Sequence, residues 1–194
     1  MAQTKILVDS NSYFRLAQNI HPLLCVPFGK KNVTLYVHSE LNKEFRSNSR
    51  LQNKFHWVSD SEYANNRTRS ISLSNQQKQD IEETFDYMWQ YAKEAFHQTR
   101  GKGPAPVDTR ILATALVLGI QVVTDDQDMI ELAEEYGVKQ LTSLALMKLM
   151  LDEGRVKLAD IQRVVAQWQY DNDTPYKNWN SEYEELFKSK PPTH

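Results

Sequence analysis

Acidic side chains follow three short apolar runs of this sequence, each close to the point where the run ends. The runs cover residues 5–8, 33–37 and 120–124, and the acids after them are Asp9, Glu40, Asp125, Asp126 and Asp128. A further acid, Asp108, opens the segment after a Pro-Ala-Pro break. Mg²⁺ and Mn²⁺ prefer oxygen ligands, so a few converging carboxylates without His or Cys suffice to hold them. Such ions assist phosphodiester hydrolysis because they activate water and offset the charge of the phosphate.

A parallel sheet would bring these acids together. The apolar runs are typical of buried parallel strands, and residues 138–141 predict one more strand. Helical patterns over 81–96, 107–118 and 144–151 lie between or after the runs. This alternation favours a parallel α/β sheet, in which ligands bind beyond the carboxyl ends of the strands.

The overall composition limits the partners and the compartment. Lys and Arg number 23 against 25 Asp and Glu, so a nucleic-acid footprint must be local. The single cysteine cannot form an internal disulfide, and no leader or roughly 18-residue apolar span is present. These features predict a cytoplasmic protein that does not enter a membrane.

The most basic stretch of the chain follows Glu40 and contains aromatic residues. It predicts contacts with RNA through Arg46, Arg50, Lys54 and Trp57. Cations would contact phosphates and an aromatic face would stack on a base. The alternative is a solvated segment whose aromatic residues pack on the sheet.

The blocks around the acids resemble the PIN-domain ribonuclease family, whose members include toxin-like nucleases of bacterial toxin–antitoxin systems. Residues 6–11 are similar to its opening strand and first metal-binding aspartate, Asp9. Residues 108–115 and 118–129 are similar in order and spacing to its third and fourth acidic motifs, and Glu40 stands where the second acid lies. The resemblance covers roughly residues 5–142, and it is close at the two ends of that stretch.

The resemblance implies a metal-dependent endoribonuclease that cleaves single-stranded or structured RNA. The catalytic and metal-binding acids would be Asp9, Glu40, Asp108 and Asp126, with Asp128 as a further metal ligand and with Asn11 and Asp125 in support. Mg²⁺ or Mn²⁺ would be the cofactor. The partners implied are RNA, a protein antitoxin or regulator, and a second copy in a homodimer.

The implied fold is a three-layer α/β/α domain with a parallel central sheet. It would occupy residues 1–153, with a long helical insertion at about 41–107, and a helical appendage would cover 154–194. The length of 194 residues suits one such domain.

Alternatives remain for the acids and for the function. Asp108, Asp126 and Asp128 suit helix caps, and Glu40 suits the positive end of a helix. Asp125, Asp126 and Asp128 compete for the fourth position, with Asp126 favoured because it lies two residues after Thr124. A phosphatase of the haloacid dehalogenase type would have a second aspartate where Asn11 stands. A PIN scaffold that binds RNA or protein without cleavage is the other alternative.

Overall fold

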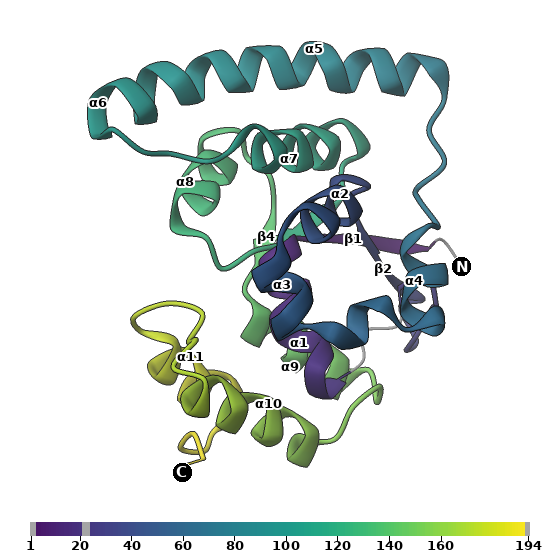
Figure 1. The fold of residues 1–194 in the computed structure, drawn as a ribbon, viewed down its shortest axis with the longest axis vertical. Helices are drawn as coiled ribbons and strands as arrows, with labels where there is room; N and C mark the ends of the chain where they lie inside the picture. Colours follow the sequence, from purple (N-terminus) through teal and green to yellow (C-terminus); the bar gives the residue numbers. More distant parts are fainter. Residues whose placement is uncertain (1–2, 21–23, 193–194) are drawn as a thin grey trace.

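A parallel sheet of four strands forms the centre of the computed structural model, which describes residues 3–20 and 24–192. The strands are β1 (Thr4–Val8), β2 (Val33–Val37), β3 (Gln121–Val123) and β4 (Gln140–Leu141), in the spatial order β2-β1-β3-β4 (Figure 1). Val8 pairs with both Val37 and Val123, so the three longest strands end level with one another. The predicted parallel α/β sheet is therefore confirmed, and the residues after these strands share one edge.

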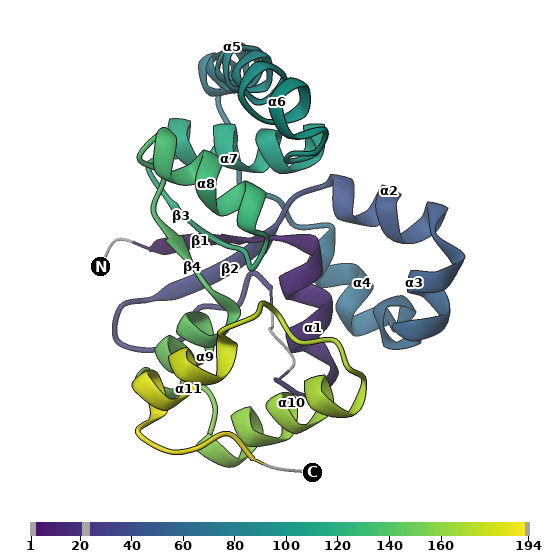
Figure 2. The ribbon, with the colours of Figure 1, turned by 90° about the vertical axis from the view of Figure 1, so that its left-hand side faces the viewer.

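Helices cover both faces of the sheet, as Figure 2 shows from the side. The helices on one face are α7 (Pro106–Leu118) and α8 (Gln127–Glu135), with α5 (Asn75–Ala92) outside them. The opposite face is covered by α1 (Ser10–Ile20) and α9 (Ser143–Asp152), with α10 (Leu158–Tyr170) and α11 (Trp179–Phe187) outside them.

The strand residues alternate between these two layers, because successive side chains of a strand point to opposite faces. Leu7 and Val122 pack in the core beneath α7 and α8. Ile6, Val8 and Val123 pack in the other core, with α1 and α9. Two apolar cores thus hold the strand ends in place, and the predicted three-layer α/β/α arrangement is confirmed.

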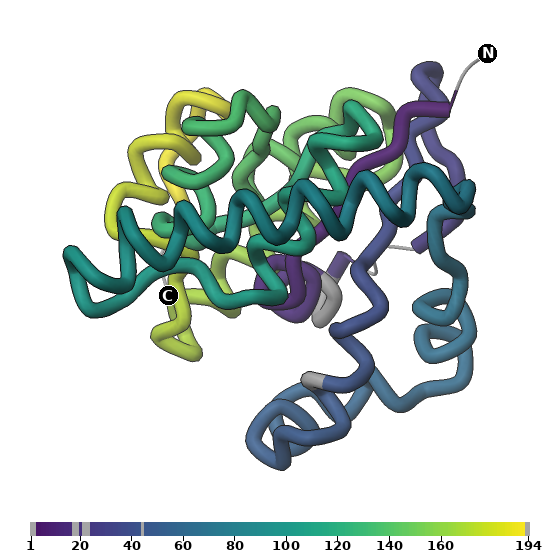
Figure 3. The backbone as a smooth tube through the Cα atoms, turned by 90° about the horizontal axis from the view of Figure 1, so that it is seen from above, coloured from purple at the N-terminus to yellow at the C-terminus, as the bar shows by residue number. Residues whose placement is uncertain are grey.

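The segment predicted to be a helical insertion is indeed mostly helical. Its first part is a lobe of α2 (Glu40–Ser47), α3 (Ser49–Lys54), the 3-10 helix η1 (His56–Ser59) and α4 (Ser61–Arg67). This lobe projects from one side of the molecule (Figure 3). Its second part is α5, which begins at a capping box of Ser74 and Gln77 and continues through the π-helical turn η2 (Lys93–His97) and α6 (Gln98–Arg100).

The C-terminal helices α10 and α11 contribute to the same apolar core as the sheet. Val164 and Trp168 of α10 and Tyr183 of α11 are buried together with residues of α1 and α9. The Trp168 indole also donates a hydrogen bond to the carbonyl of Arg15, 3.3 Å away. The predicted helices are therefore present, and they complete the outer layer on this face.

No helix within residues 3–20 and 24–192 is long and apolar enough to span a membrane.

Candidate active site at the carboxyl ends of the strands

Asp9 is a buried acid at the carboxyl end of the central strand β1. Its residue is only 4% exposed, and its backbone N–H donates to Val123 of β3 at 2.9 Å. The N–H groups of Ser10 and Ser12, at the start of α1, donate hydrogen bonds to its carboxylate. Among the described residues, no lysine or arginine forms an ion pair with Asp9. The strand end thus presents a buried acid without a compensating cation.

Asp108 enters the same region from α7. It occupies the first turn of that helix, which starts at Pro106, a residue that favours a helix start. One carboxylate oxygen of Asp108 accepts the N–H of Ala105 at 2.9 Å, so Asp108 caps the helix from its third position, and the N-cap itself is Ala105. The same carboxylate is close enough to Asp9 to interact with it electrostatically.

Burial and neighbouring acids make the charge of Asp9 unfavourable. Burial is the largest cause, and the carboxylates of Asp108 and Asp125 add to it. Together they outweigh the two N–H donors and raise the pKa of Asp9 from 3.8 to about 7. A cation placed among these groups would reverse the balance, because it favours the ionised form.

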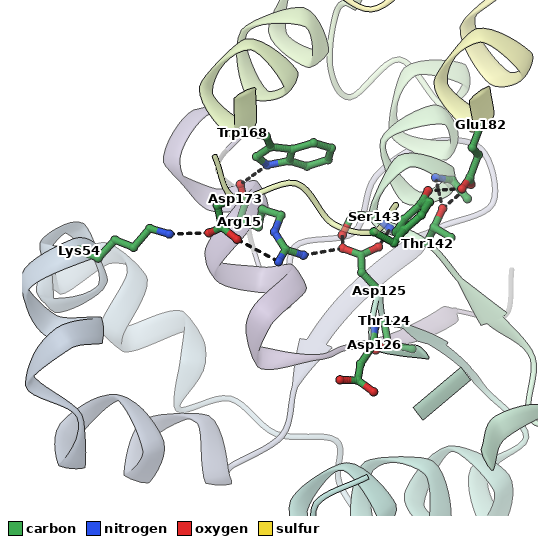
Figure 4. A network of polar contacts seen from close by, with 12 residues as sticks. Arg15, Lys54, Thr124, Asp125, Asp126, Thr142, Ser143, Trp168, Asp173 and Glu182 are labelled. Atoms are coloured by element: carbon green, nitrogen blue, oxygen red, sulfur yellow. Dashed lines mark hydrogen bonds and ion pairs between the residues drawn. The ribbon is translucent and has the colours of Figure 1, made fainter. Parts of the chain in front are cut away.

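Asp125 is held by a network that the sequence did not predict (Figure 4). Its carboxylate accepts the Ser143 backbone N–H at 2.8 Å and the Ser143 hydroxyl at 2.6 Å. Arg15 of α1 completes the set with an ion pair at 2.9 Å. These contacts tie the end of β3 to the middle of α1 and to the start of α9, and the supporting role of Asp125 at a metal site stays a prediction.

The Arg15 network continues to the C-terminal segment and the lobe. Arg15 also pairs with Asp173 at 3.4 Å, and Lys54 pairs with the same carboxylate (Figure 4). Burial opposes the charge of Asp173, but the bond from Lys54 and the charges of Arg15 and Lys54 hold the pKa of Asp173 below its usual value. No residue spacing signals these pairs, since Arg15, Asp125 and Asp173 are far apart in sequence.

Asp126 faces away from this network. Its carboxylate points in the opposite direction from that of Asp125 in Figure 4, and its residue is exposed. One oxygen accepts the N–H of Met129 at 2.9 Å, which makes Asp126 the N-cap of α8. Asp128 lies in the first turn of the same helix and is half-buried.

Glu40 and Asn11 lie at the start of helices. Glu40 opens α2 and pairs with Lys43 at 2.7 Å, and its charge acts on the neighbouring His38 rather than on Asp9. Asn11 is exposed in the first turn of α1. The structure therefore brings Asp9, Asp108 and Asp125 together, while the assignment of Glu40, Asp126 and Asp128 as ligands stays a prediction.

These residues fit a cation that needs few protein ligands. No three His, Cys, Asp or Glu side chains of the described chain are arranged to hold one metal ion. Mg²⁺ is commonly bound by one or two carboxylates together with waters and substrate phosphates. Asp9 and Asp108 supply such a pair, whereas a closed site for Zn²⁺ would need four ligands that are not assembled.

A cavity of about 480 Å³ lies on the α7 side of the sheet. Its lining includes Leu7, His38, Ser39, Lys78, Arg110 and Thr114. The lining also includes Glu82, which pairs with Arg110 at 2.5 Å, whereas neither Asp9 nor Asp108 is among the lining residues. The charge of Arg110 is thus already balanced within the wall of the cavity.

The predicted RNA-binding residues have different environments. Arg46 and Arg50 are exposed, but Lys54 is engaged by Asp173. Trp57 is half-buried, and its ring contacts those of Tyr13 at 5.7 Å and Tyr63 at 5.1 Å between centroids. Trp57 thus packs the lobe against α1, as the alternative interpretation of this stretch proposed for its aromatic residues.

We expect Trp57→Ala to destabilise the protein by about 2 kcal/mol, because it removes two aromatic contacts and leaves a gap. Urea denaturation monitored by circular dichroism measures this loss. Trp57→Phe keeps a ring in place and should recover most of it. A Trp57→Ala variant of full stability with weaker RNA binding would instead show that the indole contacts a base.

Comparisons with known proteins leave the family open. No protein-family model matches the chain, and no curated protein matches it significantly. One solved structure with similarity is that of FitAcB from Neisseria gonorrhoeae, at 18% identity and a TM-score of 0.43. The alignment covers 71% of this chain and 97% of that chain. A similarity of this size carries no argument about function.

Proposed function

We propose that this protein is a metal-dependent nuclease that hydrolyses phosphodiester bonds of RNA. The observation that carries the proposal is the position of Asp9, a buried acid beside Asp108 at the carboxyl edge of a parallel sheet, without a basic partner among the described residues. This edge is where open α/β sheets bind their ligands. The PIN-type order of the acidic motifs in the sequence supports the same function.

In this proposal each residue of the candidate site has its own role. Asp9 and Asp108 hold the cation from β1 and α7, and Asp126 is the proposed further ligand. Asp125 positions the end of β3 through Arg15 and Ser143. Mg²⁺ or Mn²⁺, when bound, supplies a Lewis acid that activates water and offsets phosphate charge.

Single-stranded or loop RNA is the proposed substrate. The chain carries no basic excess that would match a long duplex, and the cations of the lobe are few and local. A protein antitoxin is the partner that the sequence resemblance implies.

Cleavage of a labelled single-stranded RNA should require Mg²⁺ or Mn²⁺ and should stop on chelation. Asp108→Asn should lower the rate about 10²-fold or more, because it removes a carboxylate that holds the cation, and the cation offsets charge on the reacting phosphate. Asp86→Asn, an exposed change on α5, is the matched control and should leave the rate unchanged. Cleavage that persists after exhaustive removal of metal would refute the proposal.

Asp126→Asn, measured in the same cleavage assay, tests whether Asp126 is a further metal ligand. Asn caps a helix as well as Asp does, so this variant keeps α8 intact while it removes the charge. We expect a loss comparable with that of Asp108→Asn. An unchanged rate would show that Asp126 serves only as a helix cap. The metal ligand of the fourth acidic motif would then be Asp125 or Asp128.

A further inference from the structure

A second polar cavity lies inside the lobe, away from the acidic edge of the sheet. Its volume is about 280 Å³, and α2, η1 and α4 contribute its walls. The polar residues that line it are Asn42, Arg46, Ser59, Asn65, Arg67 and Thr68. No carboxylate is among its lining residues, so the cavity combines two cations with neutral hydrogen-bonding groups.

Arg67 is a buried cation whose hydrogen-bond partners among the described residues are neutral groups. Its residue is 7% exposed, and its guanidinium donates to the Val58 carbonyl at 2.5 Å and to the Asn42 side chain at 3.1 Å. The Tyr13 side chain also interacts with the guanidinium group, while the terminal nitrogen Nη1 is buried and makes no well-formed hydrogen bond to the described residues. In the described part of the chain, no Asp or Glu forms an ion pair with Arg67.

This arrangement is costly for the protein alone. A buried charge costs free energy unless it is paired, and a buried donor without an acceptor adds to that cost. The guanidinium group cannot lose its proton at ordinary pH, so Arg67 cannot lower this cost by becoming neutral. An anion in the cavity would supply both the missing charge and the missing acceptor.

We infer that this cavity binds a phosphate group, with Arg67 as the buried anchor and Arg46 as the cation at its rim. Guanidinium groups suit phosphate oxygens because their N–H donors match them in pairs. Ser59, Asn65 and Thr68 line the same space and supply neutral donors. Residues 40–69 carry six Lys and Arg against four Asp and Glu, whereas the whole chain has 23 against 25.

The phosphate site is separate from the acids of β1 and α7, so its occupancy can be measured without turnover. A phosphate in a nucleic-acid strand and a free phosphate present the same oxygens to Arg67. The site therefore extends the proposed function and does not depend on it.

Inorganic phosphate should raise the melting temperature of the wild-type chain more than chloride does at equal ionic strength. Arg46→Gln should weaken binding about fivefold, because the rim cation is lost while the buried residues stay. Arg50→Gln is the matched control, an exposed arginine of the same lobe that does not line the cavity, and should bind as the wild type does. Because phosphate stabilises most proteins by exclusion from their surface, the difference between these two variants is the decisive quantity.

Arg67→Met tests the anchor itself, and titration calorimetry of the folded variant should show at least a tenfold loss of phosphate binding. If this variant does not fold, the Arg46→Gln and Arg50→Gln pair still decides the question. Competition between phosphate and a short single-stranded RNA would assign the site to a nucleic-acid strand, and phosphate binding without competition would assign it to free phosphate. Both results uphold the site. Equal phosphate responses in wild type, Arg46→Gln and Arg50→Gln would overturn it.

Discussion

Asp9→Asn is expected to stabilise the metal-free protein at pH 8 while it abolishes metal-dependent cleavage. The rise of the pKa of Asp9 from 3.8 to about 7 corresponds to up to about 4 kcal/mol at pH 8, at about 1.36 kcal/mol per pH unit. Asn carries no charge and can still accept the N–H groups of Ser10 and Ser12. The rate of cleavage should fall about 10²-fold or more.

The sign of the pH dependence follows from proton binding. Between about pH 4 and pH 7 the folded protein keeps the proton of Asp9, and the unfolded chain has released it. The folded state therefore binds more protons in this window, so the stability of the metal-free protein falls as the pH rises through it. Asp9→Asn should remove this part of the slope.

Thermal melts of the wild type and Asp9→Asn at pH 5 and pH 8, with EDTA or Mg²⁺, measure both effects. Mg²⁺ should raise the melting temperature of the wild type at pH 8 and leave that of Asp9→Asn unchanged, because a ligand that binds only the folded state stabilises it. Asp86→Asn serves again as the exposed control. Equal metal responses in wild type and Asp9→Asn would show that the cation is held elsewhere.

Asp125→Asn is expected to have the opposite effect on stability. It leaves Arg15 without its closest carboxylate, and loss of one partner of a buried ion pair commonly costs about 3 to 5 kcal/mol. For a chain of this length, each kcal/mol lowers the melting temperature by about 2 to 4 °C. Urea denaturation of the variant should show the loss directly.

A double-mutant cycle separates this ion pair from its surroundings. Arg15→Met with Asp125→Asn should be less destabilising than the sum of the two single changes, because the second change removes an already unpaired charge. Asp173→Asn is a milder comparison, since this more exposed carboxylate should contribute at most about 1 kcal/mol. An Asp125→Asn variant of wild-type stability that has lost cleavage would identify Asp125 as a metal ligand.

The sequence by itself determined the strands, the helices and the edge of the sheet at which Asp9 and Asp125 lie. Strands appear where short apolar runs stand, and α7 (Pro106–Leu118) matches the helix predicted over 107–118, ending before Gly119 and starting one residue earlier. Strand and helix alternate, so the sheet is parallel and Asp9 and Asp125 follow neighbouring strands. These features depend on periodicity and on local backbone preferences, which a single chain segment carries within itself.

Only the tertiary structure decided which polar groups meet. Asp125 and Asp126 are adjacent in sequence, yet one turns toward Arg15 and Ser143 while the other caps α8. Successive side chains at a strand end point in opposite directions, so spacing cannot choose between them without the helices packed on each face. The burial of Arg67 was equally hidden, because its surroundings arise from the packing of α2, η1 and α4 and leave no local pattern in the chain.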